Sequence, residues 1–286
     1  MMFESLRDKV VLITGGARGI GKGLAQACLA EGARVIITNL NPEVGRAAEA
    51  ELGQLGSIRS MRCDATRADD VDVLLDDIWR NEGPIDIAFS NAGTGGHQRA
   101  LESSLDEMRS LMTTNYESAV VLAQGCIPRM LRSGKPAHVM FTASEHAVAL
   151  PAGNEDLGFV FYGASKHAML IFAEWLRADL RTTNVSVSLL LPGPVLTEGV
   201  SAAFKQLDQN PDDPAIRSTF SKSVERLLRD RAITTAECAE RALRGLRSGL
   251  FYIPTQPHIL QDINRRHDEM AAAFERMGLN QSMTDL

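Results

Sequence analysis

The sequence is poor in cysteine and has no long apolar run. Its four cysteines are scattered and form no CxxC pair; they are Cys28, Cys63, Cys126 and Cys238. This scatter is typical of reduced thiols and argues against a disulfide framework or a cysteine-based zinc site. No apolar run approaches the roughly 18 residues that a membrane-spanning helix needs. The first apolar stretch begins at residue 9 and leaves no room for a signal peptide. We therefore expect a cytoplasmic protein that does not insert into a membrane.

An excess of positive charge is also missing. Thirty Lys and Arg residues face 36 Asp and Glu residues, which gives a net charge of −6. A protein that binds a nucleic-acid backbone needs a basic surface, so we do not expect a nucleic-acid partner. Hydrophobic residues make up 44% of the chain and charged residues 23%, as in an ordinary folded enzyme. Its 286 residues suffice for one large α/β domain.

Short β-branched runs alternate with amphipathic segments along the chain. The predicted strands are 9–14, 33–38, 57–63, 85–90, 138–143, 185–191 and 250–254. Several of them are apolar nearly throughout, as parallel strands buried on both faces are. Helix starts lie between them: Asn41 before Pro42, and capping boxes in which Ser104 precedes Glu107 and Thr234 precedes Glu237. The pattern predicts an α/β fold with a doubly wound parallel sheet of Rossmann type.

Residues 1–286 show no internal repeat and no low-complexity linker, so we expect a single domain. The alternation is interrupted at 198–232, a polar segment with two prolines between the last two predicted strands. Such an insertion near the carboxyl ends of strands is a candidate substrate lid. Residues 256–286 read as a mostly helical C-terminal extension.

A glycine-rich loop follows the first predicted strand. In "TGGARGIG", Gly15, Gly19 and Gly21 lie between that strand and a helix. Glycines let the backbone approach a pyrophosphate, and the N-terminus of the helix then stabilises its charge. "SNAG" (90–93) and "PGPVLT" (192–197) follow later strands, at the edge of the sheet where doubly wound folds bind ligands. Alone, the glycine loop could be an ordinary turn, but the three segments together predict a dinucleotide site.

A tyrosine and a lysine in "YGASK" lie four residues apart, on one face of a predicted helix. A free tyrosine has a pKa near ~10, which makes it a poor base at neutral pH. We expect the ammonium of Lys166 to lower the pKa of Tyr162 and make it a general acid/base. Alone, the pair could also be an accident of packing.

The glycine loop, "NAG", "YGASK" and "PGPVLT" together resemble the short-chain dehydrogenase/reductase family. They occur in the family's order and approximate spacing from residue 9 to about 200. The resemblance implies an oxidoreductase that transfers a hydride between NAD(P) and a secondary alcohol or ketone, with Tyr162 as general acid/base. The glycine spacing differs from that of the two-domain dehydrogenases and of the family's epimerase branch.

The resemblance also implies a catalytic group of Asn115, Ser144, Tyr162 and Lys166. Ser144 would hydrogen-bond the substrate oxygen. Asn115 would break a helical turn and hold a water that links Lys166 to solvent. Eighteen positions separate Ser144 from Tyr162, more than in most members, so we expect 145–161 to form a longer loop over the pocket.

The remaining site residues implied are cofactor contacts. They are Gly15, Arg18, Gly19, Ile20, Gly21, Asn39, Asp64, Ala65, Asn91, Ala92, Gly93, Tyr162, Lys166, Pro192, Gly193, Val195 and Thr197. Asp64 would accept a hydrogen bond from the adenine. Asn39 stands where most NAD-using relatives have an aspartate, and it has no charge to repel a 2′-phosphate. Because Arg18 could reach that phosphate, the sequence favours NADP over NAD.

We predict no metal site, because His97, His146 and His167 have no ligand spacing with a carboxylate partner. Glu145 and His146 directly follow Ser144, and we expect them in the substrate pocket. A lipophilic or ring-bearing small-molecule substrate is suggested by apolar candidate pocket positions, which are Leu150, Phe159, Leu196, Phe204 and Phe220.

Two other functions stay open at this point. The chain could be an NAD(P)-binding regulator that lost its chemistry, or a nucleotide-sugar epimerase or dehydratase, which shares the Tyr/Lys pair. The predicted helices 103–132 and 161–183 carry apolar residues on more than one face. One face covers the sheet and the other needs a second partner, so we expect a homodimer or homotetramer.

Overall fold

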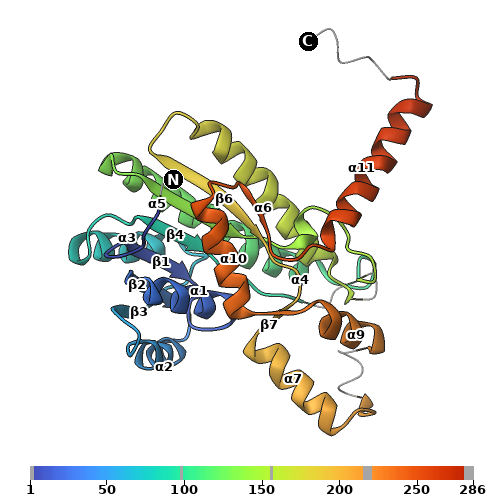
Figure 1. Cartoon of the computed structure of the whole chain (residues 1–286), viewed down its shortest axis with the longest axis horizontal. Coiled ribbons are helices and arrows are strands. Elements are labelled where there is room, and N and C mark those ends of the chain that lie inside the picture. The colour runs from blue at the N-terminus through green and yellow to red at the C-terminus, as the bar shows by residue number, and fades with distance from the viewer. Residues whose placement is uncertain (1–2, 97–98, 155–156, 215–220, 280–286) are drawn as a thin grey trace.

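The computed structural model describes residues 3–96, 99–154, 157–214 and 221–279. Seven parallel strands form one sheet in the order β3-β2-β1-β4-β5-β6-β9 (Figure 1). They are β1 Val10–Thr14, β2 Arg34–Asn39, β3 Ile58–Arg62, β4 Ile87–Ser90, β5 Ala137–Thr142, β6 Val185–Leu191 and β9 Tyr252–Pro254. Each corresponds to a run predicted from the sequence. The strand order reverses between β1 and β4, as in a doubly wound Rossmann-type sheet, so the predicted fold class is confirmed.

Helices cover both faces of the sheet. The α-helices of the described residues are α1 Gly19–Ala30, α2 Pro42–Leu52, α3 Ala68–Asn81, α4 Leu105–Met112, α5 Ser118–Ser133, α6 Val160–Asp179, α7 Glu198–Gln209, α9 Lys222–Arg231, α10 Thr235–Arg247 and α11 Ile259–Arg276. Successive side chains of a strand point to opposite faces. In β1, Leu12 packs in the cluster under α3, α5 and α6, and Ile13 packs in the cluster under α1, α2 and α10. The sheet is therefore the shared wall of two apolar cores.

The predicted helix starts are present. The side chain of Asn41 accepts hydrogen bonds from the backbone N–H groups of Glu43 and Val44. Ser104 and Thr234 each form a complete capping box with the glutamate three residues later. These caps satisfy N–H groups that the first turn of a helix leaves without partners. They fix where α2, α4 and α10 begin.

A second, two-stranded sheet was not predicted. It pairs β7 Val195–Leu196 with β8 Ile233–Thr234, and two residues are too few to show a periodic pattern. After α7 and α9 the chain returns to β7, because β8 pairs with that strand. The segment 198–232 is thus an insertion between the two short strands, and α7 and α9 stand off the main body in Figure 1.

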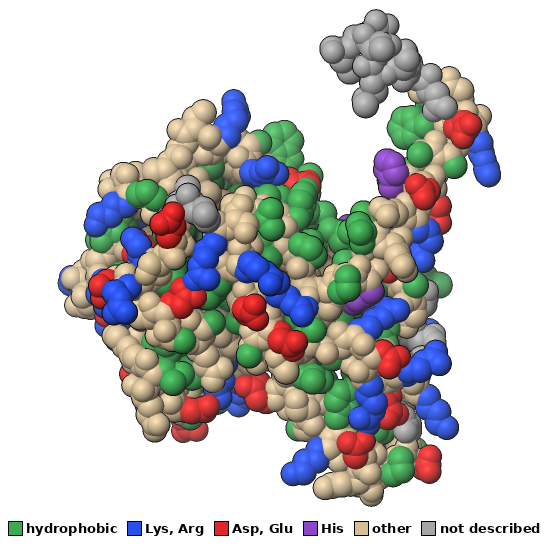
Figure 2. Space-filling model, viewed as in Figure 1, with side chains coloured by type: hydrophobic (Ala, Val, Ile, Leu, Met, Phe, Trp, Pro, Cys, Tyr) green, Lys and Arg blue, Asp and Glu red, His purple; other side chains and the backbone are tan. Residues whose placement is uncertain are grey.

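The C-terminal helix α11 also leaves the body. Ile259 and Asp262 in its first turn are buried, whereas Met270 and Phe274 further along are exposed. Figure 2 shows this arm reaching past the body, and basic and acidic side chains interspersed over the face in view. Among the described residues, no helix is long and apolar enough to cross a membrane.

Candidate functional site

A cavity of about 1110 Å³ lies at the carboxyl edge of the sheet. The predicted site residues that line it are Gly15, Arg18, Gly19, Ile20, Asn39, Asn91, Ala92, Gly93, Ser144, Tyr162, Lys166, Pro192, Gly193, Val195 and Thr197. Glu145 and His146 line it as well. Four predicted residues are not part of the lining: Gly21, Asp64, Ala65 and Asn115.

The glycine loop packs too closely for side chains. Gly15 has a φ of +62°, which residues with a Cβ rarely adopt. A Cβ on Gly21 would lie 2.4 Å from the carbonyl oxygen of Gly15, so Gly21 supports the loop from behind. At the start of α1, the N–H of Gly19 donates to Oε2 of Glu198 at 2.8 Å. The loop therefore already binds a carboxylate, and its exposed N–H suits the pyrophosphate of a dinucleotide.

Asn91 ties the glycine loop to the end of β4. Its Nδ2 donates to the carbonyl oxygens of Thr14 and Gly15, at 3.1 and 3.4 Å. The backbone N–H groups of Asn91 and Ala92 donate to Oγ1 of Thr14. These bonds satisfy polar groups at the ends of two neighbouring buried strands. They fix the relative position of the two loops on which a cofactor would rest.

Two of the predicted cofactor contacts, Asn39 and Asp64, are differently placed. Asn39 lines the cavity at the end of β2, and its Oδ1 accepts from the N–H of Asn41 at 2.9 Å. Asp64 turns its carboxylate onto Thr66, whose N–H and hydroxyl donate to it at 3.0 and 2.6 Å. These two bonds lower the pKa of Asp64. In this structure Asp64 holds the turn after β3.

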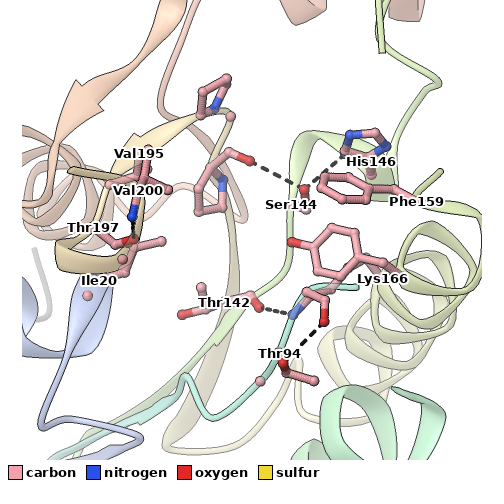
Figure 3. A pocket seen from close by; sticks show the side chains of 18 of the residues that line it. Ile20, Thr94, Thr142, Ser144, His146, Phe159, Lys166, Val195, Thr197 and Val200 are labelled. Atoms are coloured by element: carbon pink, nitrogen blue, oxygen red, sulfur yellow. Dashed lines mark hydrogen bonds between the residues drawn. The ribbon is translucent and has the colours of Figure 1, made fainter. Parts of the chain in front are cut away.

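The Tyr/Lys pair lies on the first turns of α6. Nζ of Lys166 lies 5.6 Å from the centre of the Tyr162 ring and donates to the carbonyl oxygen of Thr142 at 2.9 Å (Figure 3). Oγ of Ser144 accepts from the N–H of His146 at 3.2 Å and donates to the carbonyl oxygen of Pro192 at 3.5 Å. The second of these bonds is long and weak, so the hydroxyl can turn to another acceptor.

Burial dominates the protonation of this pair. It lowers the pKa of Lys166 to about 8 and raises the pKa of Tyr162. The hydroxyl of Ser144 acts in the opposite direction on Tyr162, and Glu145 adds to the increase. We predicted from the sequence that Lys166 lowers the pKa of Tyr162. For the chain itself that prediction is wrong, because burial raises the pKa of Tyr162 and outweighs the opposing hydrogen bond of Ser144.

Asn115 lies behind the cavity in a π-helical turn, Thr113–Glu117, so the predicted break in the helix is present. Its Oδ1 accepts from the N–H of Thr94 at 2.7 Å. Its Nδ2 donates to the carbonyl oxygen of Thr94 and to Oγ of Ser165, at 3.0 and 3.1 Å. Ser165 in turn donates to the carbonyl oxygen of Tyr162. Asn115 thus joins the loop after β4 to the turn of α6 that carries Tyr162.

Sequence reasoning missed the residue that holds the "PGPVLT" loop from behind. Gln256 follows β9; its Oε1 accepts from the N–H of Gly193 at 2.9 Å and its Nε2 donates to the carbonyl oxygen of Pro194 at 2.7 Å. One side chain thereby satisfies a donor and an acceptor in the residues that precede β7. Its position just beyond the carboxyl end of a parallel strand was the only signal in the sequence.

Glu145 is a buried carboxylic acid beside Ser144. Its Oε2 lies 2.7 Å from Nε2 of His258, and Nδ2 of Asn154 donates to its Oε1 at 3.4 Å. Burial raises the pKa of Glu145 to about 7, and the nearby Arg231 opposes the increase. Burial likewise lowers the pKa of His258. Burial thus opposes the charged form of both partners.

This fold and this site define a dinucleotide-binding oxidoreductase of Rossmann type. The sequence pattern described as "short chain dehydrogenase" matches residues 9–208. The chain therefore belongs to the short-chain dehydrogenase/reductase family, whose members bind NAD(P) and act on alcohol or carbonyl groups of small molecules. The family predicted from the sequence is confirmed.

Several relatives are similar over most of the chain. A 1-deoxy-11-beta-hydroxypentalenate dehydrogenase of Streptomyces exfoliatus is 36% identical over 203 residues, 69% of this chain and 72% of that protein. A D-threitol dehydrogenase of Mycolicibacterium smegmatis is 34% identical, over 68% of this chain and 72% of that protein. A Burkholderia phymatum short-chain dehydrogenase/reductase solved in complex with NAD superposes with a TM-score of 0.81 at 25% identity, over 94% and 96% of the two chains.

The buried acid makes stability depend on pH. Because the pKa of Glu145 is about 7 in the folded chain and ordinarily 4.5, its contribution to stability is complete below pH 4.5 and is lost as the pH rises through 7. We expect the free energy of unfolding of the wild type, relative to Glu145→Gln, to fall by roughly 2 kcal/mol between pH 4.5 and 7.5.

Urea denaturation at several pH values measures this difference. The variant Glu102→Gln, which removes an exposed carboxylate, is the control for the loss of one negative charge. A difference between wild type and Glu145→Gln that stays constant over this pH range would contradict the assignment.

Proposed function

We propose that the chain is a dehydrogenase/reductase that transfers a hydride between NAD(P) and a secondary alcohol or ketone, with Tyr162 as general acid/base. One observation carries the proposal. Ser144, Tyr162 and Lys166 line the same cavity as the glycine loop that holds a carboxylate on the N–H of Gly19. The anion site of a dinucleotide and a proton-transferring phenol thus share one space.

The side chains have distinct roles in this mechanism. The phenol of Tyr162 gives a proton to, or takes one from, the substrate oxygen. The hydroxyl of Ser144 leaves its long bond to Pro192 and donates to the same oxygen, which stabilises negative charge as it develops. The ammonium of Lys166, held by the carbonyl oxygen of Thr142, stabilises the phenolate. When bound, the nicotinamide accepts or supplies the hydride.

The residues present fit a dinucleotide. The N–H of Gly19, which now holds Glu198, would bind the pyrophosphate, and Arg18 beside it adds a positive charge. Val195 and Thr197 also line the cavity and would orient the nicotinamide. Lys166 would also reach the hydroxyls of the nicotinamide ribose. Both bonds from Thr66 go to Oδ1 of Asp64, so its Oδ2 would accept from the adenine.

The substrate we propose is lipophilic or ring-bearing. Phe159 lines the cavity as predicted, and Val200, Val224 and Leu227 add an apolar wall from the insertion 198–232. This wall supports the role of 198–232 as a substrate lid. Of the other predicted pocket positions, Leu150, Leu196 and Phe204 do not line the cavity, and Phe220 lies outside the described residues. Two of the relatives act, by their names, on hydroxyl compounds, a hydroxypentalenate and threitol.

The first prediction concerns Tyr162→Phe. This change removes the transferable proton and leaves the cavity shape nearly intact, so we expect turnover to fall at least a hundredfold with cofactor affinity within about twofold. Turnover is measured by reduced-nicotinamide absorbance on a panel of ketones and alcohols, and affinity by cofactor titration. Residual activity near the wild-type value would remove the tyrosine from its role. If the wild type itself binds cofactor but shows no turnover, the result would favour the alternative function, an NAD(P)-binding regulator that has lost its chemistry.

The second prediction concerns the choice of cofactor, for which we propose NADP. Asn39 lines the cavity without a charge that would repel a 2′-phosphate, and Arg18 lines it nearby. Asn39→Asp should shift the ratio of kcat/KM for the two cofactors toward NAD by about 1–2 kcal/mol, which is roughly tenfold. The Burkholderia relative is in complex with NAD, so both cofactors are compared in the wild type first. A tenfold wild-type preference for NAD would overturn the proposal.

The third prediction concerns assembly. Val160, Ile171 and Trp175 of α6 are exposed, at 40%, 52% and 66% of their surface, and the last two lie four residues apart. An apolar stripe of this kind needs a cover, which we propose to be α6 of a second copy about a two-fold axis. We expect a dimer or tetramer in sedimentation at micromolar concentration, and dissociation of that assembly by Trp175→Glu. A monomeric wild type would contradict this.

A further inference from the structure

Glu198 is an acidic side chain at the cavity that has no role in the proposed chemistry. It is the first residue of α7 and lines the cavity together with Gly199 and Val200. Its Oε2 accepts from the backbone N–H of Gly19 at 2.8 Å, although the two residues lie 179 positions apart in the sequence. Gly19 is the first residue of α1 and belongs to the glycine loop. A carboxylate from a distant part of the chain thus binds the donor that the proposed dinucleotide site needs.

The chain just before α7 lies against α1. A Cβ on Gly19 would lie 3.2 Å from Cγ2 of Thr197, the residue whose side chain caps α7. The strand β7, which precedes Thr197, pairs with β8. Thr235 follows β8 and packs on α1, because a Cβ on Gly23 would lie 2.7 Å from its carbonyl oxygen. The start of α7 is therefore fixed next to the glycine loop.

The rest of α7 packs less closely on the protein. Of its 12 residues only Leu207 is buried. Arg229 of α9 contacts α7 twice: its guanidinium pairs with Asp208 and lies 4.8 Å from the ring centre of Phe204. These contacts join α7 to another part of the insertion, and both helices stand off the main body (Figure 1). The bond between Gly19 and Glu198 ties α7 to the main body itself.

The carboxylate of Glu198 and a pyrophosphate would compete for this N–H. A backbone N–H has one hydrogen to donate. The partial positive charge at the N-terminus of a helix attracts either anion, but two anions at the same place repel each other. Glu198 therefore has to leave Gly19 before a pyrophosphate can bind there.

The departure of Glu198 would also affect the substrate side of the cavity. Val200 lies two residues further on in α7, and Figure 3 shows it across the cavity from Ser144 and Lys166. Its N–H donates to Oγ1 of Thr197 at 3.4 Å, so it belongs to the capped first turn of α7. In the proposed function Val200 is part of the apolar wall that contacts the substrate. One helical turn thus connects the anion site to that wall.

We propose that Glu198 is a built-in competitor of the cofactor, and that its displacement from Gly19 releases α7 and lets Val200 adjust to the substrate. The coupling is reciprocal: whatever holds α7 on Gly19 weakens cofactor binding by the same factor. This inference rests on the proposed function, because it requires a dinucleotide on the glycine loop. It gives Glu198 a role in setting the affinity for the cofactor.

The variant that tests the competition is Glu198→Gln. The amide keeps the size of the side chain and can still accept from Gly19, but it carries no charge and competes less well. We expect the Kd of ADP-ribose and of its 2′-phosphate, measured by calorimetric titration, to fall by roughly fivefold or more. Both ligands contain the pyrophosphate and lack the nicotinamide, so the measurement does not involve hydride transfer. Glu198→Ala, which removes the acceptor, should give at least the same gain in affinity.

Asp212→Asn is the matched control. Asp212 is an exposed carboxylate of the same insertion and does not line the cavity. The control should bind both ligands within about twofold of the wild type, because it changes only the long-range charge. Adenosine 2′-phosphate, which has no pyrophosphate, should bind the wild type and Glu198→Gln equally well. Unchanged or weaker binding of ADP-ribose by Glu198→Gln would overturn the inference, and so would an equal gain in the control or for adenosine 2′-phosphate.

Hydrogen exchange of the backbone amides in 198–209, followed by mass spectrometry, tests the release of α7. In the wild type, ADP-ribose should raise the exchange rate of the first turn by about twofold or more, because the tie to Gly19 is lost. Glu198→Gln should exchange at the raised rate without ligand and should not respond further. A rate in the wild type that stays the same or falls when ADP-ribose binds would overturn the inference.

These measurements separate the inference from the proposed function. If ADP-ribose binds but no alcohol or ketone is turned over, the proposed hydride transfer is contradicted, while the affinities still decide the role of Glu198. If neither ADP-ribose nor its 2′-phosphate binds the wild type or Glu198→Gln, both the dinucleotide site and the competition are overturned.

Discussion

Buried polar groups at the carboxyl edge of the sheet must find partners inside the protein, and that requirement shapes the cavity. Parallel strands covered on both faces end in loops whose N–H and C=O groups have no sheet partner. Thr14 and Asn91 satisfy one another across β1 and β4, and Gln256 satisfies the loop after β6. Each bond that satisfies a loop also fixes it. The cavity is the space that remains once the strand ends have been tied together.

The same reasoning gives the C-terminal extension a structural role. The loop after β5 is long, and its backbone groups are bonded by side chains from the start of α11. Asp262 accepts from the N–H of Ala152, while Arg265 and Arg266 donate to the carbonyl oxygens of Leu150 and Val148. The polar backbone groups of this long loop thus find their partners on a helix that follows the last strand. Two regions about 110 residues apart in the sequence act as one wall.

Most of the fold could be predicted from the sequence, because strand composition, helix caps and the glycine loop are local signals. The cavity lining could be predicted too, since the ends of parallel strands meet at one edge. The pairing of β7 with β8 could not, because two-residue strands have no period. Gln256 and His258 were missed because their roles depend on contacts with residues more than 60 positions away. The predicted direction of the pKa shift of Tyr162 was wrong for a similar reason. The sequence shows the cation four residues further on, but the depth of burial is a property of the fold.

That burial bears on the direction of proton transfer in the proposed mechanism. A phenol whose pKa is raised stays protonated at neutral pH, as an acid that protonates a developing alkoxide must. The opposite reaction needs the phenolate. The hydroxyl of Ser144 favours the phenolate, and the neighbouring cation is Lys166, whose own pKa burial lowers to about 8. Above pH 8 this ammonium loses its proton, and its support for the phenolate disappears as the phenol approaches ionisation. In the proposed mechanism the chain by itself therefore presents the protonated phenol, and the phenolate that oxidation of an alcohol needs depends on positive charge that the cofactor brings to the cavity.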